Sequence, residues 1–205
     1  MNMHHIIITG ASRGIGHATA LLYASMGWNI SICSRHCDYQ MTQTQDAITA
    51  AGGQYFSFCG DMGNAADAEE FLAKAVRTFG TPEILVNNAG ISHIGLLQDM
   101  TPMQWDDIIR TNLSSVFYTS RVIIPYFLQE KHGRIINVSS VWGSVGASTE
   151  VAYSTTKGGI NAFTKALAKE LAPSGIPVNA VACGMIDTSM NSFLDPEELA
   201  AVIDE

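Results

Sequence analysis

The chain has 205 residues, of which 47% are hydrophobic and 15% are charged, so it can bury a large core within one domain. Its net charge of −8 provides no basic field, which argues against binding to nucleic acid or to an anionic membrane surface. No apolar run approaches the roughly 18 residues of a spanning helix, and no charged leader precedes an apolar segment at the N-terminus. We therefore expect a cytoplasmic protein.

The chain contains four cysteines, Cys33, Cys37, Cys59 and Cys183. They form no CxxC pair and no cluster with histidine, and nothing indicates a secretory context. We therefore expect four reduced thiols and no metal site. The adjacent His4 and His5 lead into an apolar stretch and are interpreted as residues at the entrance of a strand.

Short apolar runs alternate with longer helical patterns along the chain, which is typical of a parallel sheet covered on both faces. The predicted strands cover residues 5–9, 29–33, 55–59, 84–87, 134–139 and 177–182. The predicted helices cover residues 15–26, 42–51, 65–79, 102–129 and 151–171. This alternation predicts a single domain with a Rossmann-type, doubly wound α/β fold, in which ligands bind at the carboxyl ends of the strands.

A glycine-rich turn, TGASRGIG at residues 9–16, follows the first predicted strand and opens the first predicted helix. Its glycines allow a tight turn beside a pyrophosphate, and the start of the helix offers free N–H groups to phosphate. The second strand ends in Ser34 and Arg35, with no acid to hold a ribose 2′-hydroxyl. Because Arg35 and Arg13 could bind a 2′-phosphate, NADP(H) is favoured over NAD(H); solvated surface arginines are the alternative.

A Ser, a Tyr and a Lys are spaced so that they could converge on one carbonyl group. Tyr153 and Lys157 are four residues apart and share one face of a helix, and Ser140 precedes Tyr153 by thirteen residues. An ammonium group near a phenol favours the phenolate, so we expect Lys157 to lower the pKa of Tyr153. Taken alone, the Tyr–Lys pair could equally mark an ordinary surface helix.

The predicted helix over residues 102–129 is apolar nearly all round, which indicates burial on both sides. Asn112 lies inside this pattern, where a buried amide without a partner is costly. A functional Asn is therefore expected here, and a structural Asn at a bend of the helix is the alternative.

In this order the motifs resemble those of the short-chain dehydrogenase/reductase family, and most closely its 3-oxoacyl-[acyl-carrier-protein] reductase group. Further matching segments are Asp61-Met62, NNAG at residues 87–90, YSTTK at residues 153–157 and GMIDT at residues 184–188. The resemblance covers nearly the whole chain.

The resemblance implies a cofactor site whose residues fall into four groups. Around the adenosine and pyrophosphate would lie Gly10, Ser12, Arg13, Gly14, Ile15 and Gly16, with Arg35 at the 2′-phosphate. Asp61 and Met62 would flank the adenine. The floor of the groove would be Asn88, Ala89 and Gly90. The nicotinamide half would be held by Tyr153, Lys157, Gly184, Ile186 and Thr188.

The resemblance also implies the catalytic roles. Reduction of a ketone develops negative charge on its oxygen, so the site needs a hydrogen-bond donor and a proton source there. Ser140 would polarise the carbonyl, and Tyr153 would deliver the proton. Lys157 would hold the nicotinamide ribose, and Asn112 would position a water that connects Lys157 to solvent. Ser139 could be mistaken for Ser140, but the spacing of the family favours Ser140.

The expected function is NADPH-dependent reduction of a ketone, above all of a 3-oxoacyl thioester on acyl carrier protein. Lys131 and Arg134 would lie beside the site and meet that acidic partner. A reductase or dehydrogenase of small ketones, alcohols or sugars is one alternative, and a catalytically weak nucleotide-binding or scaffold protein is another. The helices over residues 102–129 and 151–171 form the dimer interface of the family, so we expect a homodimer or homotetramer.

The family continues beyond residue 205 with a further strand, so we expect these 205 residues to lack the C-terminal strand and the native product to be longer. The sixth strand, residues 177–182, would otherwise be an open, apolar edge. Asp195 and Pro196 begin a well-capped helix of about two turns, and we expect residues 192–205 to be mobile or held only by neighbouring molecules.

Overall fold

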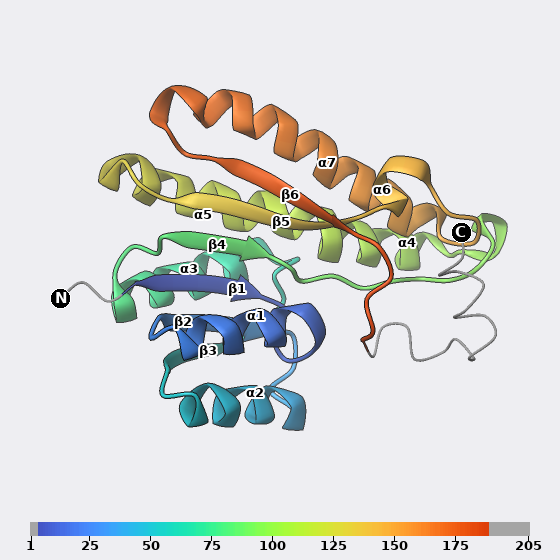
Figure 1. The fold of residues 1–205 in the computed structure, drawn as a ribbon. Helices are drawn as coiled ribbons and strands as arrows, with labels where there is room; N and C mark the ends of the chain where they lie inside the picture. Colours follow the sequence, from blue (N-terminus) through green and yellow to red (C-terminus); the bar gives the residue numbers. More distant parts are fainter. Residues whose placement is uncertain (1–3, 189–205) are drawn as a thin grey trace.

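A parallel sheet runs through the centre of the computed structural model, which describes residues 4–188 (Figure 1). Its strand order within these residues is β3-β2-β1-β4-β5-β6, and every neighbouring pair is parallel. The strands are β1 (His5–Thr9), β2 (Asn29–Ser34), β3 (Gln54–Cys59), β4 (Ile84–Asn87), β5 (Arg134–Ser140) and β6 (Val178–Cys183). The order reverses between β1 and β4, so the predicted doubly wound α/β fold in one domain is confirmed.

Helices cover both faces of this sheet (Figure 1). They are α1 (Gly14–Ser25), α2 (Tyr39–Ala50), α3 (Ala65–Phe79), α4 (Pro102–Ile109), α5 (Ser115–Glu130), α6 (Trp142–Val145) and α7 (Val151–Leu171), with short 3-10 turns at Leu97–Asp99 and Ala172–Ser174. On one face Ile6 and Ile8 of β1 pack with α1 and α2. On the other face Ile7 packs with α3, α5 and α7. The alternation of side chains along β1 thus divides the core into two layers.

The predicted continuous helix over residues 102–129 is wrong, because a π-helical turn, η2 (Arg110–Ser114), separates α4 from α5. A π turn adds a residue to the helical ladder and is favoured where a side chain must be re-aimed. Here Asn112 Oδ1 accepts the Ile91 N–H and Asn112 Nδ2 donates to the Ile91 carbonyl, both at 2.8 Å. These bonds to a neighbouring loop stabilise the widened turn, a tertiary effect that a helical pattern does not reveal.

The prediction that the helical region over residues 102–129 is buried on both sides is likewise wrong for the single chain. Ile123 and Phe127 of α5 are fully buried against the sheet. Phe117 and Leu128 on another face are 47% and 43% exposed. One apolar face of α5 therefore remains open in the single chain.

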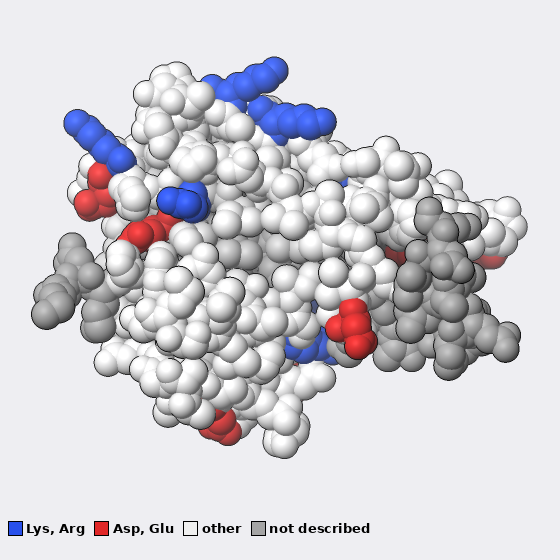
Figure 2. All heavy atoms as spheres, in the orientation of Figure 1, with Lys and Arg blue, Asp and Glu red and all other residues white. Residues whose placement is uncertain are grey.

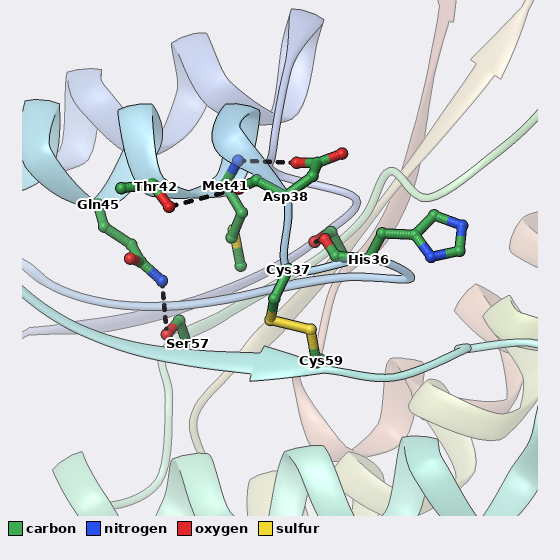
Figure 3. The surroundings of a disulfide bond; sticks show 9 residues. His36, Cys37, Asp38, Met41, Thr42, Gln45, Ser57 and Cys59 are labelled. Atoms are coloured by element: carbon green, nitrogen blue, oxygen red, sulfur yellow. Dashed lines mark hydrogen bonds between the residues drawn. A yellow bond between two sulfur atoms is a disulfide. The ribbon is translucent and has the colours of Figure 1, made fainter.

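The expectation of four reduced thiols is also wrong, because Cys37 and Cys59 form a disulfide (Figure 3). The bond joins the loop before α2 to the end of β3. The two cysteines are 22 positions apart in sequence, but β2 and β3 are neighbours and their Cα atoms lie 5.7 Å apart. Among the described residues Cys33 and Cys183 are free thiols. Cysteine spacing alone carries no signal for a pair that the sheet register brings together.

A buried polar network lies on the face of the sheet that α5 and α7 cover, and it links these helices through β4 and β5. Asn87 and Asn137 are register partners on β4 and β5, and Asn87 Nδ2 donates to Asn137 Oδ1 at 2.9 Å. Thr119 of α5 donates to Asn87 Oδ1 at 2.7 Å, and Asn137 Nδ2 donates to Thr164 Oγ1 of α7 at 2.9 Å. The network is therefore satisfied from both helices, as buried amides require.

Within residues 4–188 β6 forms an edge of the sheet, and its Val181 is 53% exposed. The expected helix at Asp195 and the expected mobility of residues 192–205 lie outside the described residues. None of the helices in the described range combines the length and apolar character that crossing a membrane demands.

Candidate active site

Two loops at the carboxyl ends of β1 and β4 are joined by hydrogen bonds. Thr9 Oγ1 accepts from the backbone N–H groups of Asn88 and Ala89, both at 3.0 Å. Asn88 Nδ2 donates to the carbonyl oxygens of Thr9 and Gly10 at 2.9 and 2.8 Å. Gly10 has φ +65°, and a Cβ there would lie 2.7 Å from Ala89 Cα. A glycine is therefore required at position 10, and the TGASRGIG and NNAG motifs form one surface.

The start of α1 is shaped for an anion. The residue before this helix, Arg13, has extended backbone and provides no side-chain cap, so the first N–H groups of the helix have no side-chain partner at its cap position. A Cβ at Gly16 would lie 2.5 Å from the Gly10 carbonyl oxygen, which shows how closely the helix packs on the turn. Free N–H groups and the helix dipole together favour a phosphate at this point.

A cleft of about 320 Å³ opens between these loops and the ends of β2 and β3. Its lining contains most of the expected cofactor residues: Gly10, Ser12, Arg13, Gly14, Ile15, Arg35, Asp61, Met62, Asn88, Ala89, Gly90 and Thr188. Gly16 lies behind the turn, and Gly184 and Ile186 follow β6 outside the lining. Sequence reasoning missed Thr111 and Gln40, which also line the cleft and which no motif marks.

Arg35 lies at the end of the cleft next to β2 and β3. Its Nη2 donates to Thr111 Oγ1 at 2.5 Å. The last residue of β2, Ser34, carries no carboxylate and donates its hydroxyl to the His36 carbonyl. The second expected phosphate ligand, Arg13, donates to Gln40 Oε1 at 3.4 Å. Both arginines thus border the cleft and have neutral hydrogen-bond partners there.

Asp61 lies across from Arg35 and stays ionised. Burial alone would raise its pKa, but the Gly63 N–H, which donates at 2.9 Å, and the charges of Arg110 and Arg35 together lower the pKa below its ordinary value. Met62 next to it is 4% exposed and belongs to the core below the cleft.

The catalytic candidates meet at the end of β5 and the start of α7. The hydroxyl groups of Ser140 and Tyr153 are hydrogen-bonded to each other, and the Trp142 N–H donates to Ser140 Oγ at 3.2 Å. Ser139 points away, into the protein, where it donates to Asn161 Oδ1 at 2.7 Å. The structure therefore brings Ser140, and not Ser139, to Tyr153.

Lys157 is buried beneath this pair, with only 4% of its surface exposed. Its Nζ donates to the Val138 carbonyl of β5 at 2.8 Å and lies 5.4 Å from the centre of the Tyr153 ring. Burial lowers the pKa of Lys157 to about 8, and Cys183 acts in the opposite direction. The ammonium form therefore still predominates at pH 7.

The expectation that Lys157 lowers the pKa of Tyr153 is wrong for this structure. Burial raises that pKa, the hydrogen bond from Ser140 lowers it, and electrostatic interactions with Glu150 and Cys183 raise it. The ammonium group of Lys157 donates to the Val138 carbonyl of β5. Tyr153 is accordingly a protonated phenol at neutral pH.

Sequence reasoning missed Glu150, which lies directly before α7 and accepts a hydrogen bond from Ser92 Oγ at 2.8 Å. Its charge acts on Tyr153. The sequence signal for this contact was the spacing of three residues between Glu150 and Tyr153, which is about one helical turn.

Asn112 is fully buried, and its amide is fully used. Besides the two bonds to Ile91, its Nδ2 donates to Thr156 Oγ1 of α7 at 3.2 Å. Asn112 thus connects the loop after β4 to the helix that carries Tyr153 and Lys157.

Lys131 and Arg134 do not lie beside the site of their own chain, contrary to expectation. Arg134 begins β5 and Ser140 ends it, so roughly 20 Å separates them along the strand. Lys131 ends α5 at the same, distant edge of the sheet. The topology places the two residues there, which sequence separation alone does not show.

A doubly wound sheet with a glycine-lined cleft at its switch point defines a class of dinucleotide-binding proteins. The family model described as short chain dehydrogenase matches residues 4–199. The chain belongs to this short-chain dehydrogenase/reductase family and is an NAD(P)-dependent oxidoreductase acting on CH–OH or ketone groups.

The chain is similar to several named proteins. The 3-oxoacyl-[acyl-carrier-protein] reductase FabG of Staphylococcus aureus (strain Mu50) is 39% identical over 191 residues, covering 93% of this chain and 78% of the relative. The FabG of Escherichia coli (strain K12) is 38% identical over 197 residues, covering 96% and 79%. Among solved structures, a protein from Sinorhizobium meliloti 1021 assigned as a short-chain alcohol dehydrogenase has a TM-score of 0.91 and 30% identity, covering 98% and 80%.

Proposed function

We propose that the protein is an NADPH-dependent reductase of 3-oxoacyl thioesters, with Tyr153 as the proton donor. The observation that carries this proposal is the hydrogen bond between Ser140 and Tyr153 above the buried Lys157, at the same edge of the sheet as the cleft. The similarity to 3-oxoacyl-[acyl-carrier-protein] reductases supports the substrate class.

The residues of the cleft fit NADP(H). The uncapped start of α1 would receive the pyrophosphate, and Arg35 with Arg13 would bind the 2′-phosphate. Gly184, Ile186 and Thr188 would hold the nicotinamide half of the cofactor. When bound, the nicotinamide supplies or accepts the hydride.

The proposed chemistry uses the protonation states described above. Ser140 would donate a hydrogen bond to the ketone oxygen, and Tyr153 would transfer its proton to that oxygen. The raised pKa keeps the Tyr153 proton in place at neutral pH until charge develops on the substrate. Lys157, mostly cationic at pH 7, would bind the ribose. Asn112 would fix this helix relative to the loop after β4 and position the water expected next to Lys157.

Apolar side chains around the site favour an acyl chain as substrate. Ile94, Leu96 and Leu97, on the loop after β4, are 47%, 54% and 55% exposed. This loop is joined to the segment before α7 by a hydrogen bond from the Gly95 N–H to the Thr149 carbonyl at 2.9 Å. Exposed apolar groups at this density indicate a surface that is covered by a ligand or partner.

The same proposal includes an acyl carrier protein as partner, a homodimer or homotetramer as assembly, and a cytoplasmic location. The exposed Phe117 on α5 supports a contact between subunits. Figure 2 shows several Lys and Arg side chains on one face, two of them next to each other at the top, which an acidic carrier protein would contact. A reductase of small ketones or alcohols is the second candidate, because of the similarity to the assigned alcohol dehydrogenase.

Cofactor titration and a substrate panel test the proposal. NADPH should bind at least tenfold more tightly than NADH, about 1.4 kcal/mol, and Arg35→Ala should remove this preference. Acetoacetyl thioesters should be reduced faster than small ketones. Equal affinities contradict the NADPH assignment, faster turnover of small ketones supports the second candidate, and binding without turnover of any substrate indicates a nucleotide-binding or scaffold protein.

A further inference from the structure

Four charged side chains form a compact cluster beside the cleft, where β2, β3 and the π turn meet. Arg110 Nη1 contacts Asp61 Oδ2 at 2.5 Å, and Arg110 Nη2 contacts Asp107 Oδ1 at 2.6 Å. Arg35 Nη2 lies 3.6 Å from a carboxylate oxygen of Asp61 and 3.6 Å from one of Asp107. Two positive and two negative charges therefore cancel.

The distances show that the two arginines have different partners. Arg110 makes the close, charge-assisted contacts with both carboxylates. At 3.6 Å, Arg35 is beyond hydrogen-bond distance of either carboxylate, and its short contact is to the neutral hydroxyl of Thr111. Arg35 lines the cleft and Arg110 does not. Arg110 is thus the close ion-pair partner of Asp61 and Asp107, while Arg35 lines the cleft.

We propose that Arg110 is a positioning residue for cofactor specificity: it holds Asp61 and Asp107 so that Arg35 stays available to a 2′-phosphate. This inference rests on the proposed use of NADPH. Without Arg110, both carboxylates have Arg35 as their nearest cation, and the cluster carries a net charge of −1 beside a phosphate dianion. Competition for Arg35 and repulsion of the phosphate then act in the same direction.

The local packing holds Arg110 in this role. A Cβ at Gly63 would lie 2.9 Å from Arg110 Cγ and 3.0 Å from its carbonyl oxygen, so the loop after β3 packs directly on this residue. The same Gly63 donates its N–H to Asp61. Arg110 is the first residue of η2, two positions before Asn112. A single turn therefore carries both the residue that orders the acids and the residue that orders the catalytic helix.

Binding measurements on four proteins test the role of Arg110. We expect Arg110→Met to raise the Kd for NADPH at least fivefold, about 1 kcal/mol, and to change the Kd for NADH less than twofold. Adding Asp107→Asn to this variant should restore most of the NADPH affinity, because one competing carboxylate is gone. The matched control is Arg77→Met on α3, an exposed arginine, which should change neither Kd. Isothermal titration with 2′,5′-ADP should reproduce the NADPH pattern without the nicotinamide half.

The outcomes separate this inference from the proposed function. A wild-type protein that binds NADH as tightly as NADPH overturns the NADPH assignment and the role of Arg110 with it. A wild-type protein that prefers NADPH, with the same preference in Arg110→Met, overturns only the role of Arg110. Equal loss of both cofactors in Arg110→Met, unrelieved by Asp107→Asn, would show general damage to the site and also overturn it.

Discussion

Replacing Lys157 by methionine should make the protein more stable at neutral pH, although it removes a residue of the proposed catalytic set. Lys157 is 4% exposed and its pKa falls from the ordinary 10.5 to about 8 because burial disfavours its charge. The folded state therefore carries a cost wherever Lys157 is protonated. Methionine has a similar length and no charge, so it fills the same space without that cost.

The pKa values set the size of the effect and its dependence on pH. A change from 10.5 to about 8 corresponds to about 3 kcal/mol at pH 7. Between pH 8 and 10.5 the unfolded chain binds the proton more tightly than the folded one, so the stability of the wild type rises with pH and the cost falls to about 1.4 kcal/mol at pH 9.5. Loss of the bond to the Val138 carbonyl offsets about 1.5 kcal/mol. Lys157→Met should thus be about 2 kcal/mol more stable at pH 7 and nearly equal to wild type at pH 9.5.

Urea unfolding of both proteins at pH 7 and pH 9.5, followed by circular dichroism, measures this difference. Lys165→Met is the matched control, because Lys165 is an exposed lysine on the same helix and should show no pH-dependent gain. A variant that is less stable than wild type at pH 7, with a difference that does not change with pH, would refute the reasoning.

Three further predictions concern the site and the disulfide. Tyr153→Phe should lower turnover roughly 10²-fold while the Kd for the cofactor stays within twofold; retained activity would contradict its role as proton donor. Glu150→Gln removes a charge that raises the pKa of Tyr153, so the alkaline limb of the kcat/KM profile should move to lower pH, and an unmoved limb would argue against the interaction. Reducing the bond between Cys37 and Cys59, which closes 22 residues, should lower the free energy of unfolding by about 3 kcal/mol; a Cys37→Ser/Cys59→Ser variant should not respond to reductant.

The sheet could be predicted because its signals are local. Continuous apolar runs such as residues 5–9 and 84–87 are buried on both faces, and their boundaries agree with the structure. The interruption at Arg110–Ser114 could not, since Asn112 is satisfied by the backbone of Ile91, a residue of a different loop.

The candidate site divides in the same way. The convergence of Ser140 with Tyr153 follows from spacing and topology, which sequence contains. The protonation state of Tyr153 could not be predicted in this way. Its pKa depends on burial and on Glu150, and the ammonium group of Lys157 donates to the Val138 carbonyl. The cluster around Arg110 likewise joins residues from three separate segments, and the sequence of any one segment does not predict it.

The buried network of Asn87 and Asn137 makes the catalytic helix part of the most protected region of the molecule. The two amides bond to each other, Thr119 of α5 completes Asn87, and Thr164 of α7 completes Asn137, so detaching α7 removes the helix partner of the Asn137 amide. Local opening of α7 therefore breaks a buried hydrogen bond to a central strand. Amide hydrogen exchange in the middle of α7 should therefore be slow compared with exchange in the loops around the cleft.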